Sequence, residues 1–239
     1  MTDKNSLYYI NEPTCISFSG GRTSAYMLHK VLEAHDGDLP EFAKITFANT
    51  GKEMPQTLDF VRDVGVNWGV DIVWLERFAR KATEEEKIGR VKTPYTSFIG
   101  IRGDEVRRAV KLNGTIESGQ ERYLPLYLEG VTAKDVGKFW DQNDFDLALP
   151  NNNGVTDWGN CDLCFLKGHK KKQSIIRSRP DLADWWIEQE ESLSKEVGLA
   201  AYFRSDQPSY RIMQTIAIEQ TSIFDDIFDD ETIPCFCGD

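Results

Sequence analysis

The sequence predicts an α/β fold, a parallel sheet with helices on both faces, followed by a mostly helical C-terminal part that contains cysteines. Two observations lead to this prediction. Within the first 75 residues, short apolar runs alternate with segments of helical periodicity, which is typical of βαβ units. After residue 150 the apolar pattern is helical, and four of the five cysteines fall there in two close pairs.

The elements follow from the spacing of apolar residues. Three short β-prone runs predict strands at 14–18, 43–48 and 71–75. Between them, helical spacing predicts helices over 23–36 and 54–68, the second with Pro55 near its start. The stretch 81–96 is polar and predicts a loop, and helices are expected at 102–110, 132–140, 167–178 and 181–196. We therefore expect an α/β domain over 1–150 and a mostly helical region over 151–239.

Composition limits the classes of function. The chain has 239 residues and a net charge of −11, so the molecule as a whole repels nucleic acid. No apolar run is long enough to span a membrane, and we expect a cytoplasmic protein without a membrane partner. The segment 167–179 is strongly basic, so nucleic-acid contact is expected there if anywhere. The alternative is that these basic residues and His169 lie on a solvent-exposed helix face and bind nothing.

The turn after the first strand, Ser-Gly-Gly-Arg-Thr-Ser at 19–24, is richer in glycine and hydroxyl groups than a connector requires. In a parallel sheet, ligands bind beyond the carboxyl ends of the strands. Backbone N–H groups at a helix start attract anions, and the Arg22 side chain adds a positive charge. The alternative is a tight turn with Thr23 or Ser24 as the helix cap.

Three segments in order carry a family resemblance. "SFSGGRTSAYMLH" resembles the PP-loop of the adenine nucleotide α-hydrolase-like superfamily, and "FANTGKEMPQTLDFV" resembles the "DTGxxxPET" signature of phosphoadenosine phosphosulfate (PAPS) reductases. "FIGIRGDEVRRA" is similar to the "GIRxxEsxxR" element of the same family. The resemblance implies an adenine nucleotide as ligand, bound by Ser19, Gly20, Gly21, Arg22, Thr23, Ser24, Asn49, Thr50, Gly51, Arg102, Arg107 and Arg108.

The chain departs from the family pattern at two acidic positions. Thr23 stands where the PP-loop usually has an acid, and Asn49 stands where the second signature has Asp. If the acid at position 23 organises Mg²⁺ in ATP-cleaving members, Thr23 counts against ATP cleavage. Mg²⁺ therefore stays an open cofactor.

The paired cysteines predict a metal site. Cys161 and Cys164 form a CxxC pair that can reach one metal, and Cys235 with Cys237 could complete four thiolate ligands. The residues alone leave zinc, an iron–sulfur cluster and an unmetallated thiol pair open. Resemblance to adenylylsulfate reductases and to thiolating relatives favours a 4Fe-4S cluster, with zinc as the alternative. By the same resemblance, Cys235 or Cys237 is the expected catalytic nucleophile.

Three functions remain in competition. The first is a PAPS- or adenylylsulfate-reductase-like oxidoreductase of sulfur metabolism, which needs a thiol reductant protein as partner. The second is an ATP pyrophosphatase-type sulfur transferase acting on tRNA or DNA. The third is a non-catalytic nucleotide-binding protein, and a homo-oligomer is compatible with all three.

Overall fold

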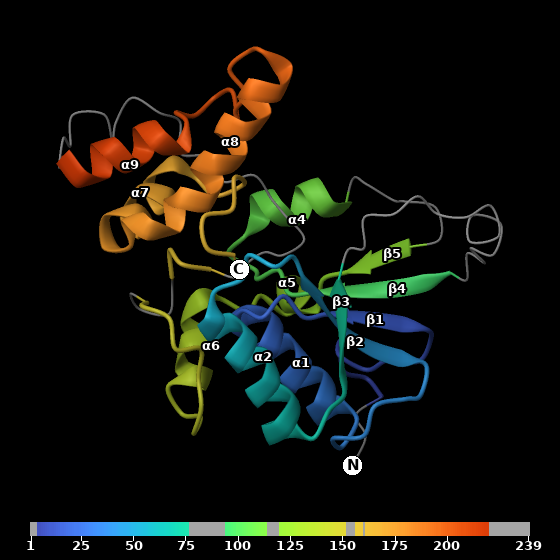
Figure 1. Cartoon of the computed structure of the whole chain (residues 1–239). Coiled ribbons are helices and arrows are strands. Elements are labelled where there is room, and N and C mark those ends of the chain that lie inside the picture. Colours follow the sequence, from blue (N-terminus) through green and yellow to red (C-terminus); the bar gives the residue numbers. More distant parts are fainter. Residues whose placement is uncertain (1–3, 77–93, 114–119, 152–155, 160, 220–239) are drawn as a thin grey trace.

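The fold is seen in a computed structural model that describes residues 4–76, 94–113, 120–151, 156–159 and 161–219. A five-stranded sheet in the order β3-β2-β1-β4-β5 forms the centre of the described N-terminal part, and every neighbouring pair is parallel. Figure 1 shows this sheet with helices packed against it and a helical group beyond it. The predicted α/β fold with a parallel sheet is confirmed.

The strands are short, and each helix follows from a local signal in the sequence. The strands are β1 (Thr14–Ser17), β2 (Ala43–Asn49), β3 (Ile72–Glu76), β4 (Tyr95–Ile99) and β5 (Gln120–Tyr123). The helices of this part are α1 (Arg22–Ala34), α2 (Pro55–Trp68), α4 (Val106–Asn113), α5 (Pro125–Glu129) and α6 (Ala133–Trp140). Helix α2 starts on a proline and ends at Gly69 in the left-handed conformation, and α6 has a capping box between Thr132 and Asp135.

Helices cover both faces of the sheet because the chain winds in two directions. From β1 it moves outward through β2 to β3, whereas β4 lies on the other side of β1 and leads outward to β5. Right-handed crossovers then place α1 and α2 on one face and α4 on the opposite face. Figure 1 shows this arrangement, with α1 and α2 on the opposite side of the sheet from α4.

Two of the five strands depart from the sequence prediction. β4 begins at Tyr95, inside the stretch expected to be a loop, and most of its side chains are buried. β5 is made of Gln, Glu, Arg and Tyr, none of which is fully buried, because it is an edge strand. A polar edge strand has no apolar run by which the sequence could reveal it.

The C-terminal helices have a hydrophobic core of their own. They are α7 (His169–Ser178), the short 3-10 turn η1 (Pro180–Leu182), α8 (Ala183–Val197) and α9 (Tyr210–Glu219). Leu163, Ile176, Trp186 and Met213 are buried together among them. The expected helices at 167–178 and 181–196 correspond to α7 and α8, while the domain boundary at residue 150 stays a prediction. Within the described residues, no helix is long and apolar enough to cross a bilayer.

Candidate nucleotide and thiol site

The predicted nucleotide-binding segments meet at one edge of the sheet. The glycine turn at 19–24 follows β1, Asn49 ends β2, and Arg102 lies shortly after β4. Because parallel strands end at the same edge, these segments converge at the carboxyl ends of β1, β2 and β4. The chain reverses its direction of winding between β1 and β4, which is the position where ligands bind in open α/β sheets.

Close packing fixes the shape of the glycine turn. Gly20 has a φ of +78°, and a Cβ on it would lie 2.7 Å from Cγ2 of the buried Thr57 on α2. Gly100, after β4, approaches the first turn of α1 so closely that an added Cβ would lie 2.9 Å from Cα of Ser24. The lack of side chains at Gly20 and Gly100 therefore lets the glycine turn pack closely on α2 and the start of α1 pack closely on the segment after β4.

The hydroxyl groups of the turn bond to one another and to the backbone. The Ser19 and Ser24 hydroxyl oxygens are 2.9 Å apart, and the Ser24 hydroxyl donates to the carbonyl of Gly21 over 3.0 Å. Gly21 is the N-cap residue of α1 and makes no side-chain capping bond. These internal bonds give the turn a defined shape. Nucleotide binding by Ser19, Gly20, Gly21, Thr23 and Ser24 stays a prediction.

The four predicted arginines lie in different environments. Arg102 donates from Nη1 to the Thr23 hydroxyl over 3.1 Å, so it contacts the glycine turn. Arg22 instead forms a bidentate pair with Asp146, with Nε 2.7 Å from Oδ1. Arg108 pairs with Glu105, and Arg107 is exposed on α4. Arg102 therefore reaches the glycine turn from the segment after β4.

The loop after β2 wraps around one carboxylate. Glu53 accepts hydrogen bonds from the backbone N–H groups of Thr50, Gly51 and Lys52 and from the Thr50 hydroxyl, at 2.7 to 3.1 Å. Asn49 donates to Glu76 over 2.8 Å and accepts from the Gly51 N–H. Three consecutive N–H groups that hold a carboxylate form an anion-binding arrangement.

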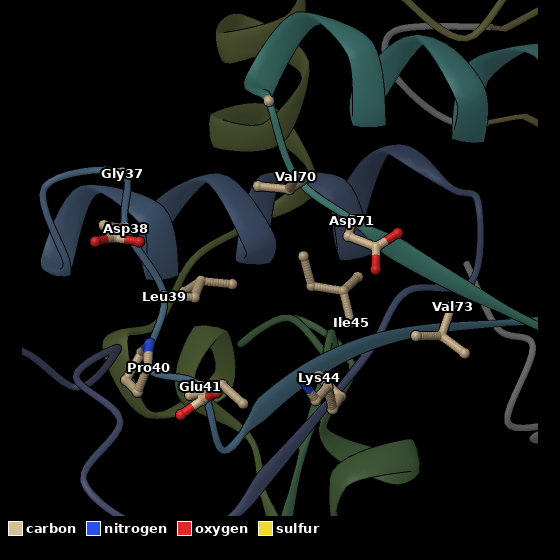
Figure 2. Close-up of a pocket in the computed structure, with 12 residues that line it drawn as sticks. Gly37, Asp38, Leu39, Pro40, Glu41, Lys44, Ile45, Val70, Asp71 and Val73 are labelled. Carbon is tan, nitrogen blue, oxygen red and sulfur yellow. The ribbon is translucent and has the colours of Figure 1, made fainter.

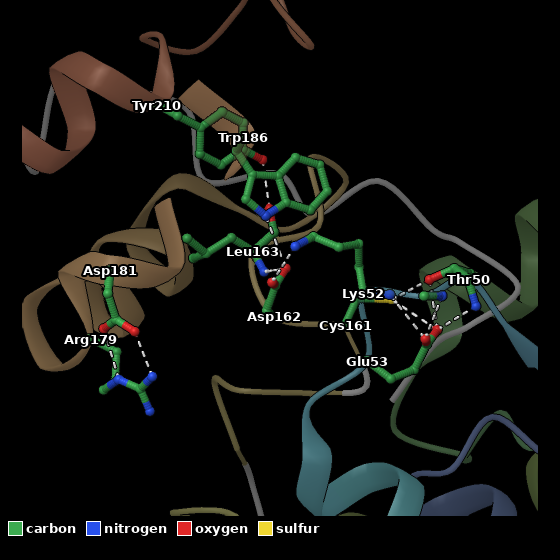
Figure 3. Close-up of polar contacts among 11 residues, drawn as sticks. Thr50, Lys52, Glu53, Cys161, Asp162, Leu163, Arg179, Asp181, Trp186 and Tyr210 are labelled. Carbon is green, nitrogen blue, oxygen red and sulfur yellow. Dashed lines mark hydrogen bonds and ion pairs between the residues drawn. The ribbon is translucent and has the colours of Figure 1, made fainter. Parts of the chain in front are cut away.

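The CxxC turn docks against this same loop. Glu53 and Cys161 form an isolated antiparallel bridge, and the N–H of Asp162 donates to the carbonyl of Lys52 over 2.8 Å. The Cys161 sulfur lies 3.8 Å from the Thr50 hydroxyl oxygen and 3.8 Å from Oε1 of Glu53. Figure 3 shows Cys161 between the Thr50–Glu53 loop and the C-terminal helices. The structure thus brings one predicted metal ligand beside a predicted nucleotide-binding residue.

Cys164 is half-buried, whereas Cys161 is buried, and the buried Lys172 interacts with Cys164. Its hydrogen bond with Cys161, together with burial, raises the pKa of the Cys164 thiol far above its ordinary value. The Tyr210 hydroxyl donates to the carbonyl of Leu163 over 2.6 Å and so holds the turn between the two cysteines. Lys172 is 1% exposed, and its Nζ lies 5.1 Å from the Tyr210 ring centre. Burial and then the neighbouring Arg204 lower the pKa of Lys172 to about 8.

A solvated helix face is the wrong description for three residues of the basic segment 167–179, while Lys170, Arg177 and Arg179 are exposed. His169, Lys172 and Lys167 are 0%, 1% and 9% exposed. Lys167 donates to the carbonyl of Trp158 over 2.7 Å, and Arg179 pairs with Asp181 at the surface. Part of the positive charge of the segment therefore supports the fold around the cysteines, and nucleic-acid binding through it stays a prediction.

Two of the four predicted thiolate ligands, Cys161 and Cys164, lie within the described residues. Cys161 and Cys164 are within hydrogen-bonding contact of each other, as two ligands of one metal must be. Cys235 and Cys237, the other predicted ligands and the predicted nucleophiles, lie outside the described residues. Among the residues that are described, no group of three or more His, Cys, Asp or Glu side chains forms a metal site.

A separate cavity of about 220 Å³ lies at the opposite edge of the sheet. Figure 2 shows it between the segment that precedes β2 and the segment that precedes β3, with Asp38, Glu41, Lys44 and Asp71 around it. It lies at the amino ends of the strands, whereas nucleotides bind at the carboxyl ends. The predicted nucleotide-binding segments lie at the carboxyl edge and not at this cavity.

Sequence reasoning did not identify several residues of the site. Glu53 belongs to the second signature but had no assigned role, and Asp162 lies inside the CxxC pair. Lys52, Lys172 and Tyr210 gave no local signal, because their contacts join segments far apart in the chain. An acid that directly follows a short glycine-containing turn, where consecutive N–H groups can point to it, could have indicated Glu53.

Comparison with known proteins adds a family. The family described as the phosphoadenosine phosphosulfate reductase domain matches residues 13–137. The uncharacterised nin region protein ORF290 of Escherichia phage lambda is 28% identical, over 65% of this chain and 67% of that protein. The uncharacterised protein MJ0066 of Methanocaldococcus jannaschii is 35% identical over 34% of this chain, and the match spans only 16% of that protein.

One solved structure is similar at a low level. The U34-tRNA thiolase NcsA from Methanococcus maripaludis, with its [4Fe-4S] cluster, superposes with a TM-score of 0.40 and 12% identity. The match covers 96% of this chain and 77% of the thiolase. At this score we transfer neither the cluster nor the activity to this chain.

Proposed function

Because the chain belongs to the phosphoadenosine phosphosulfate reductase domain family, we propose that it is an enzyme that binds an adenine nucleotide and performs sulfur chemistry beside it. More specifically, we propose that the enzyme reduces an adenylyl sulfate, and that its substrate is adenosine 5′-phosphosulfate or the 3′-phosphorylated form. A 4Fe-4S cluster on the cysteines, or zinc in its place, is part of the proposal.

The position of Cys161 carries this proposal. Its sulfur lies 3.8 Å from the hydroxyl of Thr50, in the loop that the family signature assigns to the nucleotide. The two positions are separated by more than a hundred residues in sequence, so their contact is not a consequence of local structure. A thiol next to the nucleotide loop is what sulfur transfer to or from that nucleotide requires.

Each group has a proposed part in the reaction. The N–H groups at the start of α1 and the Arg102 guanidinium bind the anionic phosphate and sulfate groups. A thiolate of Cys237 or Cys235 attacks the sulfate sulfur, the bond from that sulfur to the phosphate oxygen breaks, and the nucleoside phosphate leaves. The thiolate of a reductant then attacks the cysteine Sγ of the S-sulfocysteine, the bond from Sγ to the sulfonate sulfur breaks, sulfite leaves, and a mixed disulfide remains.

Cys161 and Cys164 are proposed to hold the metal together with one of Cys235 and Cys237, and the other tail cysteine is then free to act as the nucleophile. A cluster, when bound, supplies iron with redox and Lewis-acid properties close to the nucleotide. The buried ammonium group of Lys172 offsets the negative charge that thiolate ligands bring into this region. Both thiols must lose their protons to bind, so metal uptake is expected to release protons.

Anaerobic purification followed by a sulfite-release assay tests the proposal. We expect about four iron and four sulfide per chain for the 4Fe-4S form, and sulfite release from one of the two adenylyl sulfates with a dithiol reductant. Cys237→Ser or Cys235→Ser is expected to abolish release and retain nucleotide binding. Cys15→Ser is the matched control, because Cys15 lies on β1 with its sulfur 3.2 Å from the Thr46 hydroxyl. Full activity without either tail cysteine would refute the reductase assignment.

A sulfur transferase that uses ATP is the second candidate. Glu53 and Glu76 place carboxylates at the carboxyl ends of β2 and β3, where they could bind the Mg²⁺ that accompanies ATP. This candidate predicts pyrophosphate release from ATP and Mg²⁺ that depends on added tRNA or DNA. Tight nucleotide binding without turnover in either assay would instead indicate a non-catalytic nucleotide-binding protein.

A further inference from the structure

The docking of the CxxC turn on the Thr50–Glu53 loop depends on one lysine. Lys52 contributes its backbone carbonyl to the N–H of Asp162 over 2.8 Å. Its ammonium group lies 3.4 Å from the Asp162 carboxylate and 4.3 Å from the centre of the Trp185 ring. Lys52 therefore holds Asp162, inside the CxxC turn, by its main chain and its side chain, and it contacts the first turn of α8 by its side chain.

Asp162 needs this lysine because its side chain is only 8% exposed. Its carboxylate also accepts a hydrogen bond from the indole N–H of Trp186 over 2.9 Å and one from the N–H of Leu163. Figure 3 shows the Asp162 side chain between Lys52 and Trp186. A buried carboxylate that loses its partner charge is strongly disfavoured, so removal of the Lys52 ammonium group destabilises the docked position.

The same loop carries Thr50 and Gly51, two of the predicted nucleotide-binding residues. Thr50 and Gly51 direct their N–H groups toward the Glu53 carboxylate, so this loop has one defined conformation. Any change in the position of the loop is passed to Cys161 through its bridge with Glu53. The reverse also holds, because metal binding that fixes the CxxC turn also fixes the loop.

We propose that the Lys52–Asp162 pair positions the CxxC turn on the nucleotide loop, so that metal binding by the cysteines and nucleotide binding by the loop strengthen each other. This inference rests on the proposed function for the location of the nucleotide. Linkage requires the coupling to be reciprocal, and couplings of this kind change affinity by about 5- to 150-fold. Lys52 acts here as a positioning residue, since it acts through the loop and the turn.

The test measures nucleotide affinity with and without metal. The probes are adenosine 5′-phosphosulfate and ATP, and the full-length protein is stripped of metal with a chelator and reloaded with Zn²⁺. Zinc loading of the wild type is expected to tighten binding of one nucleotide by about fivefold or more. Lys52→Met and Asp162→Asn are expected to bring this ratio close to one, and Lys52→Arg to restore it. Lys138→Met, an exposed lysine on α6, is the matched control and should retain the full ratio.

Hydrogen exchange gives a readout that requires no nucleotide. Zinc should slow amide exchange at Thr50, Gly51 and Lys52 in the wild type and in Lys138→Met, and leave it unchanged in Lys52→Met. Asp162→Asn keeps a side-chain oxygen for the Trp186 N–H, so it tests the charge alone in case Lys52→Met fails to fold.

The outcomes separate the two proposals. If the wild type binds neither nucleotide in either form, the proposed function fails and the coupling with it. If it binds a nucleotide with the same affinity with and without zinc, the coupling is refuted and the proposed function stands. A Lys52→Met protein that retains both the affinity ratio and the zinc-dependent protection also refutes the role of Lys52.

Discussion

Replacement of Gly20 by alanine should destabilise the fold, apart from any effect on a ligand. The residue has a φ of +78°, and a side chain in the left-handed region loses about 1–2 kcal/mol. The new Cβ would also lie 2.7 Å from Thr57 Cγ2 and 3.1 Å from atoms of Phe47 and Val61. Overpacking of this kind adds about 1–3 kcal/mol. The free energy of unfolding should therefore fall by about 2–5 kcal/mol in Gly20→Ala.

A second glycine separates the two contributions. Gly69, at the end of α2, has a φ of +65° and nothing within 4 Å of an added Cβ. In Gly69→Ala the free energy of unfolding should therefore fall only by the cost of a left-handed alanine backbone, about 1–2 kcal/mol. Urea unfolding followed by circular dichroism measures both variants. The excess loss in Gly20→Ala is the contact term.

A double variant tests the identity of the contact. Thr57→Ser removes the methyl group that the Gly20→Ala side chain meets first, so the double variant should recover part of the contact term. Phe47 and Val61 remain at 3.1 Å, so recovery is expected to be incomplete. A Gly20→Ala protein no less stable than Gly69→Ala, or a double variant without recovery, would refute this account of the turn.

Three further substitutions test other parts of the site. Burial opposes ionisation of Asp104, but hydrogen bonds from the Ala133 N–H and from Arg102 hold its pKa below the ordinary value, so its contribution to stability is present above pH about 4 and lost below it. Asp104→Asn should flatten the acid limb of a plot of urea midpoint against pH; an unchanged limb would contradict this. Tyr210→Phe removes the hydroxyl that donates to the carbonyl of Leu163 and should lower the free energy of unfolding by about 1–3 kcal/mol, measured by urea unfolding against wild type. Gly100→Ala places a Cβ against the backbone of α1, so it should weaken nucleotide binding as well as stability; an unchanged nucleotide dissociation constant in calorimetry would argue against that contact.

The first half of the fold could be predicted because its signals are local. β1, α1, β2, α2 and β3 each follow from an apolar run or a helical period, and the observed bounds differ from the expected ones by one or two residues. The glycine turn was identifiable for a related reason. The backbone conformation at position 20 favours glycine, so the turn can be recognised in the sequence by its glycines.

The basic segment shows why composition can mislead. A run of lysines predicts a solvated face, since burial of a charge is unfavourable. Here Lys167 bonds to backbone carbonyls, and Lys172 lies over the Tyr210 ring and interacts with the Cys164 thiol. Partners of these kinds make the burial of lysine tolerable, and the ring over Lys172 comes from a helix 38 residues further along the chain.

The position of the cysteine turn was likewise beyond sequence reasoning. The CxxC spacing indicates two thiols that reach one metal, but it contains no information about what lies opposite them. That neighbour is set by the pairing of Lys52 with Asp162 across more than a hundred residues. The sequence therefore predicts the metal site and the nucleotide site independently. In the structure, Cys161 of the first lies 3.8 Å from the Thr50 hydroxyl of the second.

The substitution at Thr23 bears on which nucleotide this joined site is built for. An acid at position 23 would lie next to the Arg102 guanidinium, which already contacts Asp104 at 2.9 Å and Glu105 at 3.7 Å. With threonine there, the turn has one negative charge fewer, and its hydroxyl accepts a hydrogen bond from Arg102 instead. A carboxylate at this position would repel an anion unless a metal ion lay between them. With threonine, an anion can approach the N–H groups of α1 without a metal ion. The change therefore favours an adenylyl sulfate over ATP with Mg²⁺, and restoring the acid by Thr23→Asp should weaken binding of adenosine 5′-phosphosulfate in the absence of Mg²⁺. Tighter binding under those conditions would overturn this argument.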